Sequence, residues 1–213
     1  MMNYEDHRRN YILGGLRSHM LTDSPFELFA QWQQQAIDAG LKDPTAVSLG
    51  TIDTRGALWQ RIVLLKGVSG GGFVFFTNYQ SNKARALTQD NRASLLFPWN
   101  ELDRQVSASG LVEKVSEAES DAYFASRPRA SQLGAWASTQ SAVIANRDDL
   151  EANYQAVTTR FEGADAIPRP AHWGGFRLVA DTVEFWQGGE HRLHDRFRYE
   201  LEDGVWHKQR LQP

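Results

Sequence analysis

Three segments of the chain concentrate cationic and hydrogen-bonding side chains at spacings that could bind an anion. The densest is residues 190–196, which read EHRLHDR and directly follow a Trp-Gln-Gly-Gly stretch. If this segment is extended, its side chains alternate between faces, so Glu190, Arg192, His194 and Arg196 share one face. Two guanidiniums flanking an imidazole form an anion-facing surface, and histidine can act near neutral pH. A solvated strand edge carrying mixed charge explains the pattern equally well.

The other two segments each offer a second interpretation. Residues 61–66, RIVLLK, read as a buried strand whose charged ends, Arg61 and Lys66, could reach a phosphate or could simply lie in solvent. Tyr123 and Arg127 are spaced i,i+4, which places both on one helix face, and Ser131 follows a break at proline. A phenol, a guanidinium and a hydroxyl together would clamp a phosphate. The alternative is an exposed helix end with Arg127 beside the terminal carbonyls.

Several other signals do not indicate a site. The glycines at 70–72 lack the residues of a phosphate-binding loop and are typical of a hairpin turn. The six histidines form no metal-ligand motif, so no metal is expected. No G-x-S-x-G segment is present. The seven tryptophans are more typical of core and interface positions than of a binding stripe.

Composition limits the class of protein. The 213 residues fit a single domain, 1–213, and 41% hydrophobic residues are enough for a core. A net charge of −3 argues against nucleic acid as the main partner. The absence of cysteine excludes disulfides and thiolate chemistry. No apolar run approaches the ~18 residues of a membrane span and no signal peptide is visible, so a cytoplasmic protein without membrane attachment is expected.

The pattern of elements predicts a mainly antiparallel β-barrel with peripheral helices. One helix should start at Ser24-Pro25 and end at Gly40, and a later helix should end at Gly163. Another helix should start at Ser116 and end near Arg127-Pro128. Residues 1–20 form a polar N-terminal segment. The predicted helices are 25–39, 81–90, 117–127 and 147–162, and the predicted strands are 46–52, 58–66, 73–77, 94–99, 105–115, 175–179, 182–186, 192–201 and 205–211.

Taken together, the three segments resemble the pyridoxine (pyridoxamine) 5′-phosphate oxidase family. The resemblance lies in RIVLLK at 61–66, SRPRASQLGAW at 126–136 and FWQGGEHRLHDR at 185–196, with further support from SLLFPW at 94–99 and WGGFR at 173–177. It implies a split β-barrel homodimer with FMN at the subunit interface. It also implies oxidation of pyridoxine or pyridoxamine 5′-phosphate to pyridoxal 5′-phosphate, with O2 as acceptor, H2O2 as by-product and ammonia released from the amine.

The resemblance also implies a role for particular residues, carried over motif by motif. Arg192 and His194 fall on the catalytic positions beside the substrate ring. The substrate-binding positions are Arg8, Tyr11, Lys66, Tyr123, Arg127, Ser131, Arg192 and His194, where Arg8 and Tyr11 belong to an N-terminal segment that closes as a lid. The flavin positions are Arg61, Ile62, Val63, Leu64, Leu65, Lys66, Phe76, Thr77, Lys83, Gln105, Gln140, Ser141, Trp186 and Arg196.

Two positions depart from the family pattern. Asn82 stands where the family commonly has an arginine that contacts the flavin phosphate, so affinity for FMN would be lower or supplied by Lys83 and Arg61. Asn10 replaces a usual acid in the N-terminal segment. Two other functions stay open on the same fold: a flavin reductase-like oxidoreductase acting on another substrate, and a non-catalytic carrier of FMN or pyridoxal phosphate.

Overall fold

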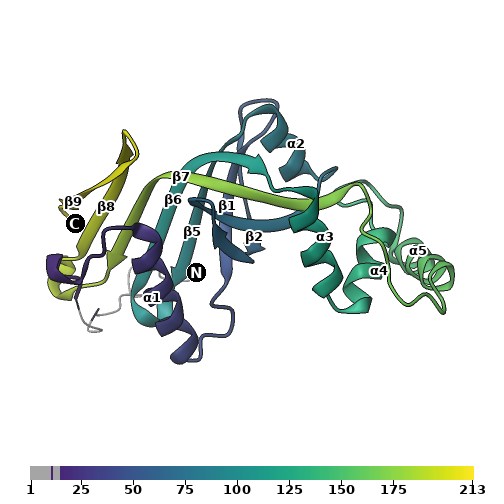
Figure 1. Cartoon of the computed structure of the whole chain (residues 1–213), viewed down its shortest axis with the longest axis horizontal. Helices are drawn as coiled ribbons and strands as arrows, with labels where there is room; N and C mark the ends of the chain where they lie inside the picture. The colour runs from purple at the N-terminus through teal and green to yellow at the C-terminus, as the bar shows by residue number, and fades with distance from the viewer. Residues whose placement is uncertain (1–10, 12–14) are drawn as a thin grey trace, which may run out of the picture.

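One long strand, β7, organises the molecule (Figure 1). The computed structural model describes residue 11 and residues 15–213. In this part of the chain the helices are α1 (Pro25–Asp38), α2 (Asn82–Gln89), α3 (Glu117–Ser126), α4 (Arg129–Ala137) and α5 (Arg147–Arg160), with 3-10 turns at Ser18–Met20, Asn100–Leu102 and Glu190–Arg192. The strands are β1 (Ala46–Ile52), β2 (Leu58–Leu64), β3 (Gly67–Ser69), β4 (Gly72–Asn78), β5 (Arg92–Trp99), β6 (Arg104–Lys114), β7 (Trp173–Gln187), β8 (Asp195–Glu202) and β9 (Val205–Leu211).

All described strand pairs are antiparallel, and the order β2-β1-β5-β6-β7-β4-β3 curls the sheet into a half-barrel. Strand β7 pairs with β6 along one edge. On its other edge, residues 173–179 pair with β4 and residues 182–187 pair with β8. Strand β7 therefore connects the end that carries α3, α4 and α5 to the end that carries β8 and β9 (Figure 1).

Two apolar clusters hold these ends together. Helix α1 packs its buried face on the sheet, where Phe29 lies 4.9 Å from Phe73 and 4.8 Å from Phe97, and Trp32 lies 5.2 Å from Phe185, measured between ring centroids. A second cluster of buried residues joins α3, α4, the connector after α5 and the start of β7. The second cluster fixes the helical end against the strand that runs to the other end.

The predicted fold class, mainly antiparallel β with peripheral helices, is confirmed. Three details were wrong. The strand predicted over 192–201 begins only at Asp195, because residues 190–192 form a 3-10 turn in which His191 and Arg192 have φ of 56° and 65°. The strands predicted at 175–179 and 182–186 are one strand with a bulge between them, because Ser109 and Gly110 of β6 pair with Thr182 and Ala180 and leave Asp181 without a pairing partner on β6. Strand β3 and helix α4 were not predicted.

The N-terminal segment meets the barrel at Leu16. Its side chain is 1% exposed, and its backbone N–H donates to Asp195 Oδ2 at 3.0 Å. Residues 1–10 and 12–14, including Arg8 and Asn10, lie outside the described residues, so the lid over residues 1–20 stays a prediction. None of the described helices is long and apolar enough to cross a membrane.

Candidate functional site

The first group of predicted site residues lines a cavity of about 640 Å³ between β2, β4, α3 and α4, which we call the first half-site. It brings together residues from five separate stretches of sequence. The predicted residues that line it are Ile62, Val63, Leu64, Lys66, Phe76, Thr77, Lys83, Tyr123, Arg127, Ser131 and Gln140. Ser131 lies in the first turn of α4, so the segment after the proline break is helical and turns its hydroxyl-bearing face to the cavity.

Aromatic rings form the wall that carries Arg127. The ring of Phe76 stacks on Tyr123 with centroids 4.0 Å apart and on Trp173 at 5.5 Å. The Arg127 guanidinium lies 4.6 Å over the Trp173 ring. Its Nη1 is buried and makes no hydrogen bond with the described residues. Burial lowers the pKa of Arg127, and the nearby Tyr123 works in the opposite direction. An unpaired buried donor of this kind is costly unless a ligand accepts from it.

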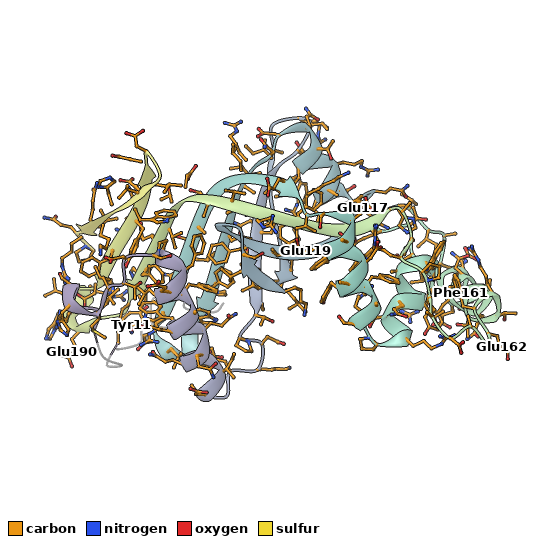
Figure 2. The ribbon with its side chains drawn as sticks, in the orientation of Figure 1. Tyr11, Glu117, Glu119, Phe161, Glu162 and Glu190 are labelled. Carbon is orange, nitrogen blue, oxygen red and sulfur yellow. The ribbon has the colours of Figure 1, made fainter. Side chains whose placement is uncertain are left out.

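Helix α3 holds Tyr123 and Arg127 in place through its first turn. Ser116 caps the helix, and its Oγ accepts from the backbone N–H of Glu119 at 3.1 Å. The acidic first turn is then bound by two arginines from outside the helix. Arg169 pairs with Glu117 and donates to Asp121, and Arg177 pairs with Glu119 at 3.0 Å. Figure 2 labels Glu117 and Glu119 at this end of α3.

A polar network continues the first half-site toward α2. Thr77 Oγ1 donates to Gln140 Oε1 at 3.1 Å, and Lys83 Nζ donates to Thr77 Oγ1 at 3.2 Å. Burial lowers the pKa of Lys83, and the charge of Arg61 lowers it further. Arg61 and Ser141 line an adjoining cavity of about 540 Å³ that shares Lys83 with the first. These flavin positions therefore lie together.

The sequence predicted a buried strand at 61–66, but the apolar residues of β2 are only partly buried, with Val63 packed against the core. Ile62 is 61% exposed and Leu64 is 44% exposed, although both line the first half-site. Leu65 differs from its neighbours, because its side chain is 5% exposed within the hydrophobic core and lines neither cavity. A contact from Leu65 to a flavin would therefore have to come from its backbone.

The second group of predicted residues lies at the opposite end of β7, which we call the second half-site. It consists of Tyr11, Gln105, Trp186, Arg192, His194 and Arg196. The Tyr11 ring lies edge-on to Trp186 at 5.6 Å and to His194 at 5.2 Å, and Trp186 lies 4.6 Å from His194. The Arg192 guanidinium lies 5.9 Å from the Tyr11 ring centroid. Figure 2 shows Tyr11 and Glu190 together at this end.

The loop before β8 sets the tautomer of His194. The backbone N–H of Gly189 donates to His194 Nδ1 at 3.1 Å, so in the neutral ring the proton is on Nε2. Burial and then the charge of Arg192 lower the pKa of His194 below its ordinary 6.5. The side chain is therefore a neutral hydrogen-bond donor at neutral pH. Gly188 leaves space for Tyr11, because a Cβ at 188 would lie 2.5 Å from Tyr11 Cδ1.

Arg196 faces a different partner from Arg192 and His194. Its Nε donates to Glu184 Oε1 at 2.8 Å and its Nη1 donates to the Gln212 carbonyl at 3.0 Å. The predicted common face of residues 190–196 is therefore wrong for the loop part, because the turn at 190–192 breaks the alternation. Arg192 and His194 gather on Tyr11 and Trp186, whereas Arg196 belongs to β8 and faces β7.

One chain does not bring the two half-sites together. Trp173 lines the first and Trp186 the second, and both lie on β7. At about 3.3 Å per residue, that strand spans roughly 40 Å between them. Within one chain, each half-site therefore lies apart from the other. Among the described residues no three His, Cys, Asp or Glu side chains lie close enough together to hold a metal ion.

Several residues of the half-sites were missed from the sequence. Trp173 supplies the ring under Arg127, and the WGGFR segment was the available signal. Gly189 orients His194 through its backbone, and Glu184 pairs with Arg196. A backbone donor and a partner on a neighbouring strand leave no local pattern in the sequence.

These features define a half-barrel protein with cationic, aromatic-walled half-sites at both ends of one strand, and the comparisons with known proteins agree with that class. The family model described as pyridoxamine 5′-phosphate oxidase matches residues 33–161, and the model described as the pyridoxine 5′-phosphate oxidase C-terminal dimerisation region matches residues 173–213. The chain belongs to the pyridoxine/pyridoxamine 5′-phosphate oxidase family, a family of oxidoreductases.

Curated relatives match along the whole chain. A pyridoxine/pyridoxamine 5′-phosphate oxidase of Synechocystis sp. is 51% identical over 208 residues, covering 98% of this chain and 97% of the relative. The protein of the same name from Aliivibrio fischeri is 49% identical over 212 residues and covers 100% of both chains.

Solved structures share the fold. PhzG from Burkholderia lata, solved with tetrahydrophenazine-1-carboxylic acid, has a TM-score of 0.87 at 30% identity, covering 93% of this chain and 98% of that one. A related FMN-binding protein from Nostoc punctiforme has a TM-score of 0.72 at 15% identity, covering 91% and 100%, and it shows the fold alone.

Proposed function

We propose that the protein oxidises pyridoxine 5′-phosphate or pyridoxamine 5′-phosphate to pyridoxal 5′-phosphate with FMN as cofactor and O2 as electron acceptor. The observation that carries this proposal is the clamp in the first half-site. Lys66, Tyr123, Arg127 and Ser131 line one cavity, and Arg127 Nη1 is buried there without a partner among the described residues. A phosphate monoester supplies the acceptor oxygens and the negative charge that this arrangement lacks.

The residues of the second half-site suit the other end of such a substrate. His194 presents Nε2–H as a donor, because its Nδ1 accepts from Gly189. Arg192 adds a positive charge beside it, over Tyr11. We infer that these two side chains orient the substrate ring and stabilise negative charge on it. In the neutral ring Nε2 already carries a proton, so Nε2 cannot act as a base. His194 is therefore a positioning donor in this proposal.

The residues present fit a flavin phosphate as well as a substrate. Arg61 and Lys83 are partly or wholly buried without a carboxylate partner among the described residues. When bound, FMN supplies the two-electron acceptor that no side chain here provides, and O2 takes the electrons and two protons as H2O2. An alcohol substrate loses two hydrogens to give the aldehyde directly. An amine substrate gives an imine, to which water adds before ammonia leaves.

We further propose that the working unit is a homodimer in which each site combines the first half-site of one copy with the second half-site of the other. The roughly 40 Å between the half-sites on one strand supports this arrangement. So do the exposed apolar side chains of β2, which are Leu58, Trp59, Ile62 and Leu64. The second half-site also lies within residues 173–213, apart from Tyr11 and Gln105, where the family's dimerisation region matches.

An assay under air tests the activity. Purified protein loaded with FMN is mixed with pyridoxine 5′-phosphate, and peroxide and the aldehyde absorbance are followed together. Equal amounts of both products are expected. A flavin that stays oxidised without product formation would indicate a carrier. Flavin reduction by a nicotinamide donor, without aldehyde from either B6 ester, would indicate a reductase.

Mixing two impaired variants tests the shared site. Arg127→Ala removes the clamp from the first half-site, and Arg192→Ala alters the second. A heterodimer purified with two different tags contains one site with both changes and one intact site. We expect about half the activity of the unchanged dimer, whereas each variant alone is impaired in both of its sites. No recovery in a verified heterodimer would show that both half-sites act within one chain.

A further inference from the structure

The cavity of about 540 Å³ beside the first half-site carries more positive charge than its own carboxylate balances. Arg55, Arg61, Lys83 and Arg85 all line it, and the one acid among its lining residues is Asp53. The cavity shares Lys83 with the first half-site, so the two spaces adjoin.

Asp53 is already occupied. Its Oδ1 accepts from the backbone N–H groups of Arg55 at 2.8 Å and Ala57 at 2.9 Å, and its Oδ2 accepts from Trp59 Nε1 at 3.1 Å. These backbone hydrogen bonds lower the pKa of Asp53. The Arg55 guanidinium pairs with the same carboxylate. Asp53 and Arg55 therefore form a neutral unit and leave the other three cations unbalanced.

Those three cations have neutral partners within the described part of the chain. Arg61 Nη1 donates to Thr51 Oγ1 at 2.7 Å and to the Leu49 carbonyl at 3.0 Å. Lys83 Nζ donates to Thr77 Oγ1 at 3.2 Å. Burial lowers the pKa of both Arg61 and Lys83, as expected for cations held away from water without an anion. The cavity therefore carries a net positive charge that a dianion would balance.

Arg85 is tied to the position where this chain departs from its family. Its Nη2 donates to Asn82 Oδ1 at 2.5 Å, one turn back along α2. This bond holds the guanidinium over the first turn of the helix, and four of its five N–H donors are left for other acceptors. Asn82 itself brings no charge, but it is placed to direct the charge of Arg85.

We propose that Arg85, oriented by Asn82, is a cationic ligand of the flavin phosphate and replaces the charge that an arginine at position 82 would bring. This inference rests on the proposed function, because it takes FMN to be the cofactor. The phosphate would lie among Arg61, Lys83 and Arg85. The aromatic walls of the first half-site are separate from this cavity, so the rest of the flavin does not depend on Arg85.

Equilibrium binding of FMN and riboflavin to the full-length, flavin-free protein tests the proposal. Riboflavin lacks the phosphate, so it reports the ring site alone. We expect Arg85→Ala to weaken FMN binding about tenfold, as for the loss of one charge-assisted hydrogen bond, and to leave riboflavin binding unchanged. Adding Asn82→Arg to that variant should restore affinity for FMN. Arg55→Ala is the matched control from the same cavity, and it should change the affinity less than twofold because Asp53 already pairs with Arg55.

Two results would overturn the role of Arg85. One is an FMN affinity of Arg85→Ala within twofold of the unchanged protein. The other is an equal loss of FMN and riboflavin affinity, which would make Arg85 a structural residue. A failure of FMN as the cofactor is distinguishable, because the unchanged protein would then bind FMN no more tightly than riboflavin. A carrier or a reductase would still bind FMN more tightly, and the oxidation assay under air would identify it.

Discussion

Replacing Arg127 by alanine is the sharpest test of the phosphate clamp. The change removes a guanidinium whose Nη1 is buried and unpaired among the described residues, and which lies 4.6 Å over Trp173. A charge-assisted hydrogen bond is worth about 1.5–3 kcal/mol, so losing one weakens substrate binding roughly 10- to 150-fold. The phosphate is not the group that is oxidised, so KM should rise much more than kcat falls.

The assay compares two substrates. Oxidation of pyridoxine 5′-phosphate and of unphosphorylated pyridoxine is measured for the unchanged protein, for Arg127→Ala and for Arg127→Lys. The loss of activity in Arg127→Ala should appear with the phosphate ester alone. Arg127→Lys should recover part of this activity, because lysine keeps the charge but lacks the planar fork of arginine. Arg147→Ala is the control, since Arg147 is exposed and pairs with Glu151 outside the cavity.

The unfolding temperature separates a binding effect from a folding effect. Truncation removes a buried donor without a partner, which raises the stability of the variant. It also removes a cation–π contact of about 0.5–1 kcal/mol, which lowers that stability. The two effects oppose one another, so the unfolding temperature should shift by a few degrees at most. An equal loss of activity on both substrates, at an unchanged unfolding temperature, would refute the assignment of Arg127 to the phosphate.

Three further predictions concern other parts of the half-sites. Gly188→Ala should displace Tyr11, whose Cδ1 would lie 2.5 Å from the new Cβ, and so raise KM and alter tryptophan fluorescence. Nitrogen NMR should show the neutral His194 ring protonated on Nε2 and should give a titration midpoint for this ring below 6.5. As the pH falls below 6.5, the unfolded chain takes up this proton before the folded chain does, so His194 lowers the stability of the fold at acidic pH. Ser116→Ala should cost about 1 kcal/mol in the free energy of unfolding, measured by denaturant titration, because it removes the cap of α3.

The sequence predicted best where local chemistry alone determines the backbone. Strands β1 and β9 have the predicted bounds, and the turn before β9 contains Asp203 and Gly204 with φ of 49° and 79°. Such turns need residues that tolerate positive φ, and those residues are visible in the sequence. Helices α1, α2, α3 and α5 each begin after a Ser or Asn whose side chain accepts from the first turn.

The prediction failed where tertiary contacts decide. Helix α4 has Pro128 at its N-cap and no capping side chain, so the usual start signal is missing. Strand β7 continues through Asp181, which lay between two predicted strands, because the strand accommodates Asp181 as an extra, bulged residue opposite Ser109 and Gly110 of β6. A Cβ at Gly110 would lie well inside contact distance of the Val179 carbonyl, so glycine is required on the facing strand.

The separation of the two groups of predicted residues was missed for the same reason. Sequence patterns indicate which side chains share an element, and they carry no information on whether two elements of one chain face each other. Tyr123 and Arg127 were placed together correctly by their helical spacing. Arg192 and Arg196 were placed together by strand alternation, and the positive φ of His191 and Arg192 breaks that alternation.

The geometry of β7 has a consequence for assembly. A two-fold axis relates the two copies of a closed homodimer, so every contact between the half-sites occurs twice. If the first half-site of one copy meets the second half-site of the other, the reciprocal pair must form as well, and two complete sites appear together. Because one continuous strand carries Trp173 and Trp186, the spacing of the two sites is set by the bend of β7. A substitution that changes this bend, even far from both half-sites, would therefore misalign the first half-site of one copy with the second half-site of the other and lower the activity of the dimer.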